Sequence, residues 1–139
     1  LLGTCYLKVN KLDLAEKNLI SSINLNQTMS SATHNLGITF SLKKNFSEAT
    51  KQFLKVLEQE PENIETLIEL GRNYELSHEF IDAENAYKKV LNIDPNNKTT
   101  NGLLGRMLIN IGFHKKGLYF IRKSKGLIRF KDNNFKIIS

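Results

Sequence analysis

The chain has 139 residues, of which 40% are hydrophobic and 24% charged, a composition typical of one soluble globular domain. It has no apolar run of the roughly 18 residues that a membrane-spanning helix needs, no visible secretory signal, and a single Cys5 that cannot form an internal disulfide. We therefore expect neither a membrane-spanning protein nor a disulfide scaffold, whereas the formal net charge of +6 indicates nucleic acid or an anionic membrane surface as partners.

The sequence repeats with a period of 34 residues. Shifting it by whole periods aligns four Leu-Gly pairs, which are Leu2-Gly3, Leu36-Gly37, Leu70-Gly71 and Leu104-Gly105. The only two prolines, Pro61 and Pro95, are also 34 residues apart. A period of this length indicates a stack of similar supersecondary units, each of which buries an apolar face against its neighbour.

The first unit, residues 1–29, is expected to be partial, because the chain opens at Leu2-Gly3, inside the first helix of a unit. Its recurring positions continue with Leu12, Ala15 and Leu19, where a second helix is expected. We expect the chain to be a piece of a longer array or of a longer protein.

Two complete units follow, at 30–63 and 64–97, and the second of them shows most clearly how a unit folds. Apolar residues at i, i+3, i+4 and i+7 predict a helix on each side of a polar break at 77–79. Gly71 and Ala83 are predicted to let the two backbones approach closely, while Tyr74 and Tyr87 fill the space beside them. Asp94-Pro95 is predicted to end the second helix, because the residue before proline is pushed out of helical geometry.

The fourth unit, residues 98–125, is degenerate. It keeps Leu104-Gly105 but has His114 in place of the recurring aromatic residue and Gly117 in place of the recurring alanine. Terminal repeats commonly lose such residues, because one of their faces meets water. We expect His114 to be a partly buried packing residue rather than a ligand.

The tail, residues 126–139, allows two interpretations. Two short β-branched and aromatic runs around Asp132-Asn133-Asn134 are typical of a hairpin. Alternatively, Phe130, Phe135 and Ile138 cover the apolar face of the last repeat, so that the tail caps the array, and we prefer this interpretation.

These recurring residues resemble the tetratricopeptide repeat (TPR) family over nearly the whole chain. The resemblance implies an all-α fold, a solenoid of TPR-type helical hairpins wound as a right-handed superhelix, followed by the short irregular or hairpin-like tail. It also implies that the first helices of the units line a concave groove that binds an extended peptide or a partner's helix.

The candidates for such a groove are the residues of the first helices that lie outside the core positions. They are Ser31, His34, Asn35, Ile38 and Ser41; Glu65, Ile68, Glu69, Arg72 and Glu75; and Thr99, Arg106, Ile109 and Asn110. Arg72 and Arg106 occupy the same repeat position, and their guanidinium groups offer forked donors for carboxylates or phosphates. Equally, they neutralise neighbouring glutamates on a solvated face.

We find no catalytic constellation and no metal site in the sequence. The three histidines do not recur at one repeat position, no HExxH or His/Cys cluster occurs, and none of the glycines forms a phosphate-binding loop. We therefore expect no enzyme activity of this chain and no cofactor.

The net positive charge of the chain comes from its C-terminal end. Residues 1–97 have ten basic and thirteen acidic side chains, a net charge of −3, whereas residues 98–139 have ten basic and one acidic, a net charge of +9. The basic surface is predicted to comprise Lys115, Lys116, Arg122, Lys123, Lys125 and Arg129. Aromatic residues lie among them, but at helical spacing these are more often core residues than platforms for bases.

We expect a non-enzymatic scaffold for protein–protein interaction, in a cytoplasmic setting, with a protein or peptide partner that has acidic groups. The alternative is the substrate-recruiting or targeting region of a longer enzyme, such as a transferase or an oxygenase. Binding of nucleic acid is the less favoured third hypothesis.

Overall fold

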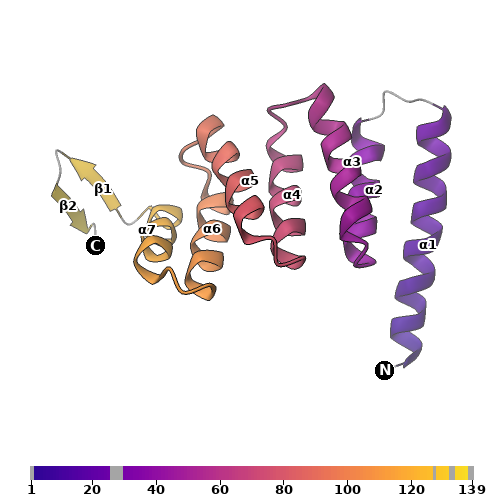
Figure 1. Ribbon diagram of the computed structural model, residues 1–139, viewed down its shortest axis with the longest axis horizontal. Helices are drawn as coiled ribbons and strands as arrows, with labels where there is room; N and C mark the ends of the chain where they lie inside the picture. Colours follow the sequence, from indigo (N-terminus) through magenta and orange to yellow (C-terminus); the bar gives the residue numbers. More distant parts are fainter. Residues whose placement is uncertain (1, 26–29, 127, 132–133, 138–139) are drawn as a thin grey trace.

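A computed structural model describes the backbone of residues 2–25, 30–126, 128–131 and 134–137, and the side chains of residues 10–25 and 30–126. The helices are α1 (Leu2–Leu25), α2 (Ser30–Leu42), α3 (Phe46–Gln59), α4 (Ile64–Leu76), α5 (Phe80–Ile93), α6 (Lys98–Asn110) and α7 (His114–Ser124). Two strands follow, β1 (Ile128–Lys131) and β2 (Asn134–Ile137). Figure 1 shows the helices side by side in one row, from α1 at the N-terminal end to α7. The predicted all-α solenoid of TPR-type hairpins is confirmed.

Three helical hairpins form the row, α2/α3, α4/α5 and α6/α7. Their turns contain Lys44, His78 and Gly112, whose φ angles of 61°, 64° and 95° lie in the left-handed region. These three residues are 34 positions apart, so each hairpin reverses direction at the same place in its repeat. The predicted break at 77–79 is confirmed, since α4 ends at Leu76 and α5 begins at Phe80.

Asparagine side chains start the first helices of the last two hairpins. Asn63 Oδ1 accepts a hydrogen bond from the Thr66 amide, and Asn97 Oδ1 accepts one from the Thr100 amide, each at 2.9 Å. Such caps satisfy an amide that has no partner within the helix. The predicted end of the preceding helix is also confirmed, because α5 stops at Ile93, directly before Asp94.

The recurring glycines of α2 and α4 lie against aromatic rings. A Cβ atom on Gly71 would lie 2.5 Å from Cε1 of Tyr87, and one on Gly37 would lie 2.6 Å from Cε1 of Phe53. The Tyr87 ring therefore fills the space beside Gly71, as the sequence predicts.

The last hairpin does bring two backbones together. A Cβ atom on Gly105 would lie 2.8 Å from the Gly117 carbonyl oxygen, and one on Gly117 would lie 2.6 Å from the Gly105 carbonyl oxygen. Ile121 stands where α3 and α5 have Phe53 and Tyr87. The smaller side chains of this unit thus permit a closer crossing of α6 and α7.

The core is continuous from one hairpin to the next. One cluster comprises Ala49, Phe53 and Leu70, and a second comprises Ala83, Tyr87, Leu104, Met107 and Leu108. Tyr74 packs against both clusters and so connects them. Each hairpin buries its remaining apolar face against its neighbour, as a solenoid requires.

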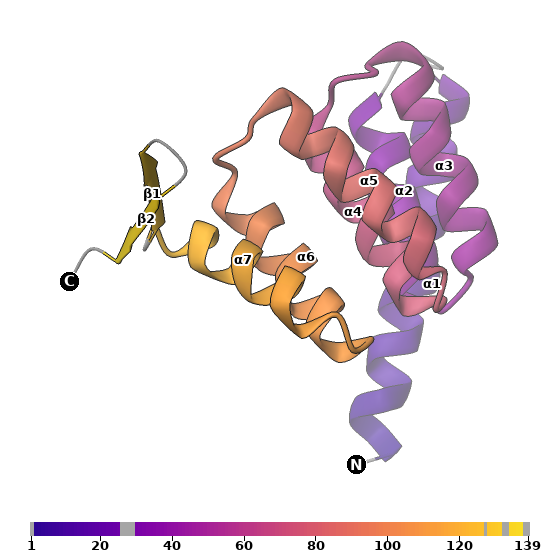
Figure 2. The same ribbon diagram turned by 60° about the vertical axis from the view of Figure 1, so that its left-hand side comes forward.

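Helix α1 differs from the later units, because it continues without a turn through Asn10, the position that corresponds to Lys44 and His78. Its C-terminal part packs against α2. Figures 1 and 2 show its N-terminal part extending past the end of α2 and away from the row. A hairpin is therefore absent from the described residues of the first unit.

The tail forms the hairpin that we considered the less favoured interpretation. Strands β1 and β2 pair antiparallel, with Ile128 opposite Ile137 and Phe130 opposite Phe135. Figure 2 shows both strands beyond the C-terminal end of α7. The side chains proposed to cap the last repeat lie outside the described residues, so capping stays a prediction.

Candidate functional site

The first helices of the three hairpins, α2, α4 and α6, hold the residues predicted to bind a partner. We refer to these fourteen residues together as the first-helix surface. Exposed members are Ser31, Asn35, Glu65, Arg72, Thr99, Arg106 and Asn110, and half-buried members are His34, Ile38, Ser41, Ile68, Glu69, Glu75 and Ile109. None of the fourteen is fully buried, so every member is accessible to some degree.

His34 joins the first two hairpins. Its Nδ1 lies 2.9 Å from Oγ1 of Thr66 on α4, and its ring meets the Phe53 ring edge-on, with 5.9 Å between centroids. One repeat later the corresponding pair is Ile68 and Thr100, and Thr100 Oγ1 has no hydrogen-bond partner among the described residues. His34 therefore has a structural role between repeats, besides its place on the surface.

The acidic residues of α4 are partly engaged within the protein. Arg72 donates to Glu69 Oε1 at 3.1 Å, and the hydroxyl of Tyr87 donates to Glu75 Oε2 at 3.0 Å. Burial, and then the negative charge of Glu75, raise the pKa of Tyr87 above its ordinary value. Glu65 is exposed and makes no ion pair with a described residue.

Arg106 is the basic residue of the first-helix surface that forms no ion pair with a described residue. It is exposed, and within the part of the chain that the structure describes no carboxylate lies within ion-pair distance. Arg72, by contrast, already satisfies Glu69. Of the two interpretations of this arginine pair, neutralisation thus fits Arg72, while Arg106 has donors left for a ligand.

Four residues of the predicted basic surface lie on α7, Lys125 follows its last residue, and Arg129 is on β1. Lys115, Lys116, Arg122 and Lys125 are exposed, and Lys123 is half-buried. Lys116 is engaged, because it donates to Glu84 on α5 at 2.6 Å. The side chain of Arg129 lies outside the described residues.

His114 is exposed at the start of α7, so the expectation of a partly buried packing residue was wrong. Phe46 and Phe80 at the same repeat position are half-buried, whereas the polar imidazole of His114 stays in solvent.

Two cavities within the helical array lie away from the first-helix surface. One of about 320 Å³ is lined by residues of α1, α2 and α3, among them Ile23, Ser30 and Gln52. Another of about 470 Å³ lies between α3, α4 and α5, beside Leu54, Tyr74 and Asn85. Neither of these two cavities is lined by a member of the first-helix surface.

Several buried polar residues were missed by sequence reasoning. Asn73 is fully buried, and its Nδ2 donates to the Phe46 carbonyl oxygen at 3.0 Å and to Thr50 Oγ1 at 2.9 Å. Asn101 is also fully buried and donates to the carbonyl oxygens of Pro95 and Asn97. Neither asparagine recurs at its repeat position, so the repeat gave no signal for them.

Within the described part of the chain, no three His, Cys, Asp or Glu residues are grouped so that they could hold a metal ion. None of the described helices is long and apolar enough to cross a membrane.

Solved structures with this fold include several of MamA. A crystal structure of MamA has a TM-score of 0.77 at 19% identity, covering 90% of this chain and 73% of that one. MamA from Desulfovibrio magneticus RS-1 has a TM-score of 0.77 at 18% identity, with 90% and 71% covered. MamA from MSR-1 has 0.72 at 23% identity, with 90% and 72% covered. No family model and no curated protein matches the chain. Likeness at these identities shows the fold alone.

Proposed function

We propose that the chain belongs to the tetratricopeptide repeat family and is a non-enzymatic scaffold that binds a peptide or a partner's helix on its first-helix surface. The observation that carries the proposal is the contrast between core and surface. The core positions recur from repeat to repeat, whereas α2, α4 and α6 present a different polar set at each repeat. A preformed surface of this kind binds a ligand with little ordering cost.

The charges of this surface define the partner. Exposed Glu65 on α4 favours a basic group, and exposed Arg106 on α6 favours a carboxylate. The α7 cations next to α6 extend the positive region. A partner with acidic groups over α6 and α7 is therefore favoured, because opposite charges steer and orient binding.

The alternative function, recruitment of substrates for a longer enzyme, uses the same surface, and none of our observations favours it over the simple scaffold. Nucleic acid is the less favoured partner, because only part of the aromatic set at this end of the row is open to bases. Phe120 packs into the core and Tyr119 contacts it edge-on, at 5.1 Å between ring centroids, whereas Phe113 is exposed. A cytoplasmic setting stays a prediction.

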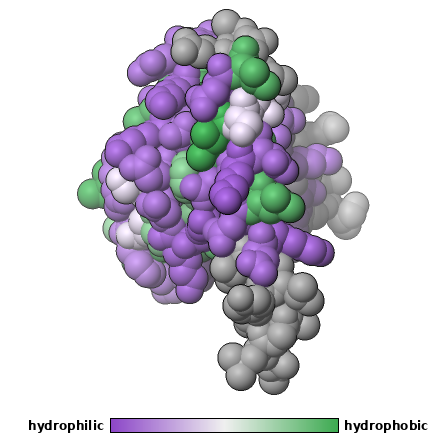
Figure 3. All heavy atoms as spheres, turned by 90° about the vertical axis from the view of Figure 1, so that its right-hand side faces the viewer, coloured by the Kyte–Doolittle hydropathy of each residue, from purple (hydrophilic) through white to green (hydrophobic). Residues whose placement is uncertain are grey.

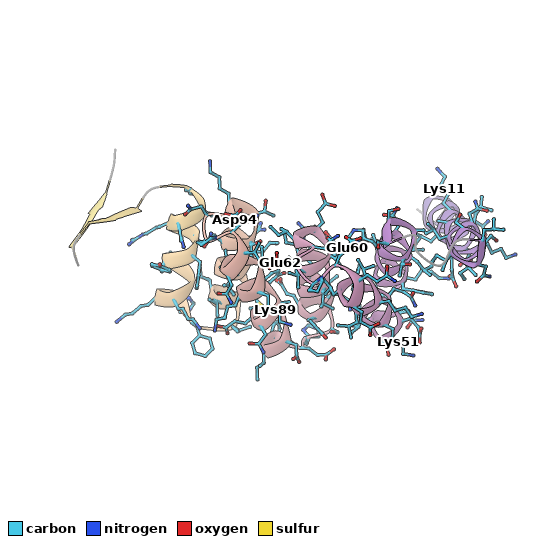
Figure 4. All side chains as sticks on the ribbon, turned by 90° about the horizontal axis from the view of Figure 1, so that it is seen from above. Lys11, Lys51, Glu60, Glu62, Lys89 and Asp94 are labelled. Carbon is cyan, nitrogen blue, oxygen red and sulfur yellow. The ribbon has the colours of Figure 1, made fainter. Side chains whose placement is uncertain are left out.

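The proposal is tested by affinity capture with quantitative mass spectrometry, using wild-type protein, Arg106→Glu and Lys89→Glu as baits. Lys89 is an exposed cation on α5, and Figure 4 shows it toward the same side of the row as Lys51 of α3. Charge reversal at Arg106 should lower recovery of the specific partner about tenfold, since charged pairs at interfaces contribute on the order of 1.5 kcal/mol or more. Lys89→Glu should leave recovery unchanged. Equal recovery with all three baits would overturn the proposal.

A further inference from the structure

Helix α1 has an apolar face that the rest of the described chain leaves partly open. Ala15 and Leu19 on this face are half-buried. The residues at the same repeat positions in the next two hairpins, each 0% exposed, are Ala49, Phe53, Ala83 and Tyr87. The first unit thus lacks a cover that the later units have.

In the later units this cover is the first helix of the same hairpin. Gly37 faces Phe53, Gly71 faces Tyr87, and Ile109 Cγ1 would lie 2.6 Å from a Cβ atom on Gly117. Moving Gly37 and Phe53 back by one repeat gives Gly3 opposite Leu19. Moving Ile109 and Gly117 back by three repeats gives Leu7 opposite Ala15. The repeat therefore specifies what covers the open face: the Leu-Gly-x-x-Tyr segment at residues 2–9.

The same copy of the chain cannot supply this cover in the structure described. Residues 2–9 and Leu19 belong to one unbroken helix, so the segment points along the axis and away from the open face. Figure 1 shows α1 as one rod that extends beyond the other helices at its N-terminal end. The continuous helix therefore keeps the backbone of residues 2–9 away from the open face of the same chain.

A second copy of the chain offers a partner for residues 2–9 and a cover for the open face of α1 in a single arrangement. Because Gly3 pairs with Leu19 and Leu7 with Ala15, two α1 helices lying antiparallel and centred near Lys11 satisfy all the pairs of both copies. Such a contact is isologous and closes on itself.

The face of α1 that contacts α2 stays undisturbed in this arrangement. Lys43 of α2 donates to Asp13 at 2.7 Å and to Glu16 at 2.6 Å, so these two acidic residues mark the side of α1 already in use. Figure 3, which faces the α1 end, shows a mostly hydrophilic surface with scattered hydrophobic side chains. The arrangement does not require a large exposed hydrophobic patch, because the pairing of Gly3 with Leu19 sets the register of the two helices.

We propose that two copies of this chain associate through α1, each packing residues 2–9 against Ala15 and Leu19 of the other. The association completes the first repeat of both copies with the contacts that the later repeats make within one chain.

The first test measures the mass of the 139-residue chain by sedimentation over a wide range of concentrations. Gly3→Val should raise the dissociation constant of the dimer about tenfold or more, because the added side chain meets Leu19 as a Cβ on Gly37 would meet Phe53. Thr4→Val, which places the same valine side chain at the adjacent position, should leave it unchanged. A wild-type chain that is monomeric throughout, or equal behaviour of both variants, overturns the proposal.

The second test shows which chain covers the open face. Leu7→Cys and Ala15→Cys are made in separate chains, each with Cys5→Ser, and the two are mixed under mild oxidation. A disulfide between the two different chains is expected, and none when Leu14→Cys, an exposed neighbour, replaces Ala15→Cys. If both cysteines placed in one chain form only an intrachain disulfide, the first unit closes on itself at Asn10 and exchange between copies is refuted.

Discussion

Glu84 joins the last hairpin to the one before it. Its Oε1 accepts from Lys88 on α5 at 2.8 Å and from Lys116 on α7 at 2.6 Å. The hydrogen bond from Lys116, and then that from Lys88, lowers the pKa of Glu84 below its ordinary value. The two ion pairs therefore stabilise the folded protein only while Glu84 is ionised.

Replacing Glu84 by Gln should lower the free energy of unfolding by about 0.5 to 1 kcal/mol at neutral pH, because partly exposed ion pairs contribute this much. Since the folded-state pKa is lowered, the contribution is present above the unfolded-state pKa and is lost as the pH falls through the folded-state pKa. Urea unfolding of both proteins at neutral and acidic pH measures this.

The matched control for that experiment is Glu58→Gln, since Glu58 is exposed and makes no ion pair with a described residue. It should change stability little at either pH. A Glu84→Gln deficit that persisted undiminished in acid would mean that packing, rather than charge, explains the effect.

Some residue roles were predictable and others were not. The different fates of Arg72 and Arg106 follow from local sequence, because Glu69 precedes Arg72 by three positions whereas Leu103 precedes Arg106. The role of Asn73 had no such signal. Its partners Phe46 and Thr50 are 27 and 23 residues away, and its repeat position is otherwise occupied by Cys5, Thr39 and Met107.

At the scale of helices, the crossing of α6 and α7 explains why the fourth repeat departs from the others. Gly117 replaces the alanine of the earlier repeats, and the Gly105 backbone occupies the space that a Cβ would need. The fourth repeat therefore has smaller residues on both helices, and the closer approach of the two backbones fills the space that larger side chains fill in the other repeats.

Gly117→Ala, which restores the residue of the other repeats, should destabilise the protein by about 1 to 3 kcal/mol, since the methyl group meets backbone atoms that cannot move aside. The gain in helix propensity, about 1 kcal/mol, offsets this only in part. Urea unfolding measures the difference in the free energy of unfolding.

Gly102→Ala in α6 is the control for Gly117→Ala. A Cβ atom on Gly102 would find its nearest neighbours, in Ser124, at 3.8 Å, which is ordinary contact. This variant should be stabilised by about 0.5 to 1 kcal/mol, because alanine favours the helix. If both variants gained stability, the close crossing would not be what selects glycine at position 117.

The hairpins were predictable from the 34-residue period, and the two ends of the chain were not. At the N-terminal end, the recurring residues Leu12, Ala15 and Leu19 predict a separate second helix, but nothing between Leu7 and Leu12 breaks a helix. At the C-terminal end, the pairing of β1 with β2 uses only local hydrogen bonds. The repeat specifies neither feature, because both depart from the pattern that the two complete units share.

Over the whole molecule, charge changes along the row of helices. The net charge of −3 before Lys98 and of +9 from Lys98 onward divides the array into a mildly acidic part and a strongly basic end. The net charge of +6, considered alone, favours nucleic acid or an anionic membrane surface. Its distribution is the basis of our proposal that a protein partner lies across α4 and α6 with its acidic groups toward α7.

The central claim is that the first-helix surface is where a partner binds, and carbodiimide labelling of carboxylates, read by mass spectrometry, tests it most directly. Glu65 on α4 and Asp82 on α5 are both exposed, but Asp82 lines the cavity between α3, α4 and α5. With the captured partner bound, we expect labelling of Glu65 to fall severalfold while labelling of Asp82 stays the same. Protection of Asp82 with Glu65 unchanged would contradict the account.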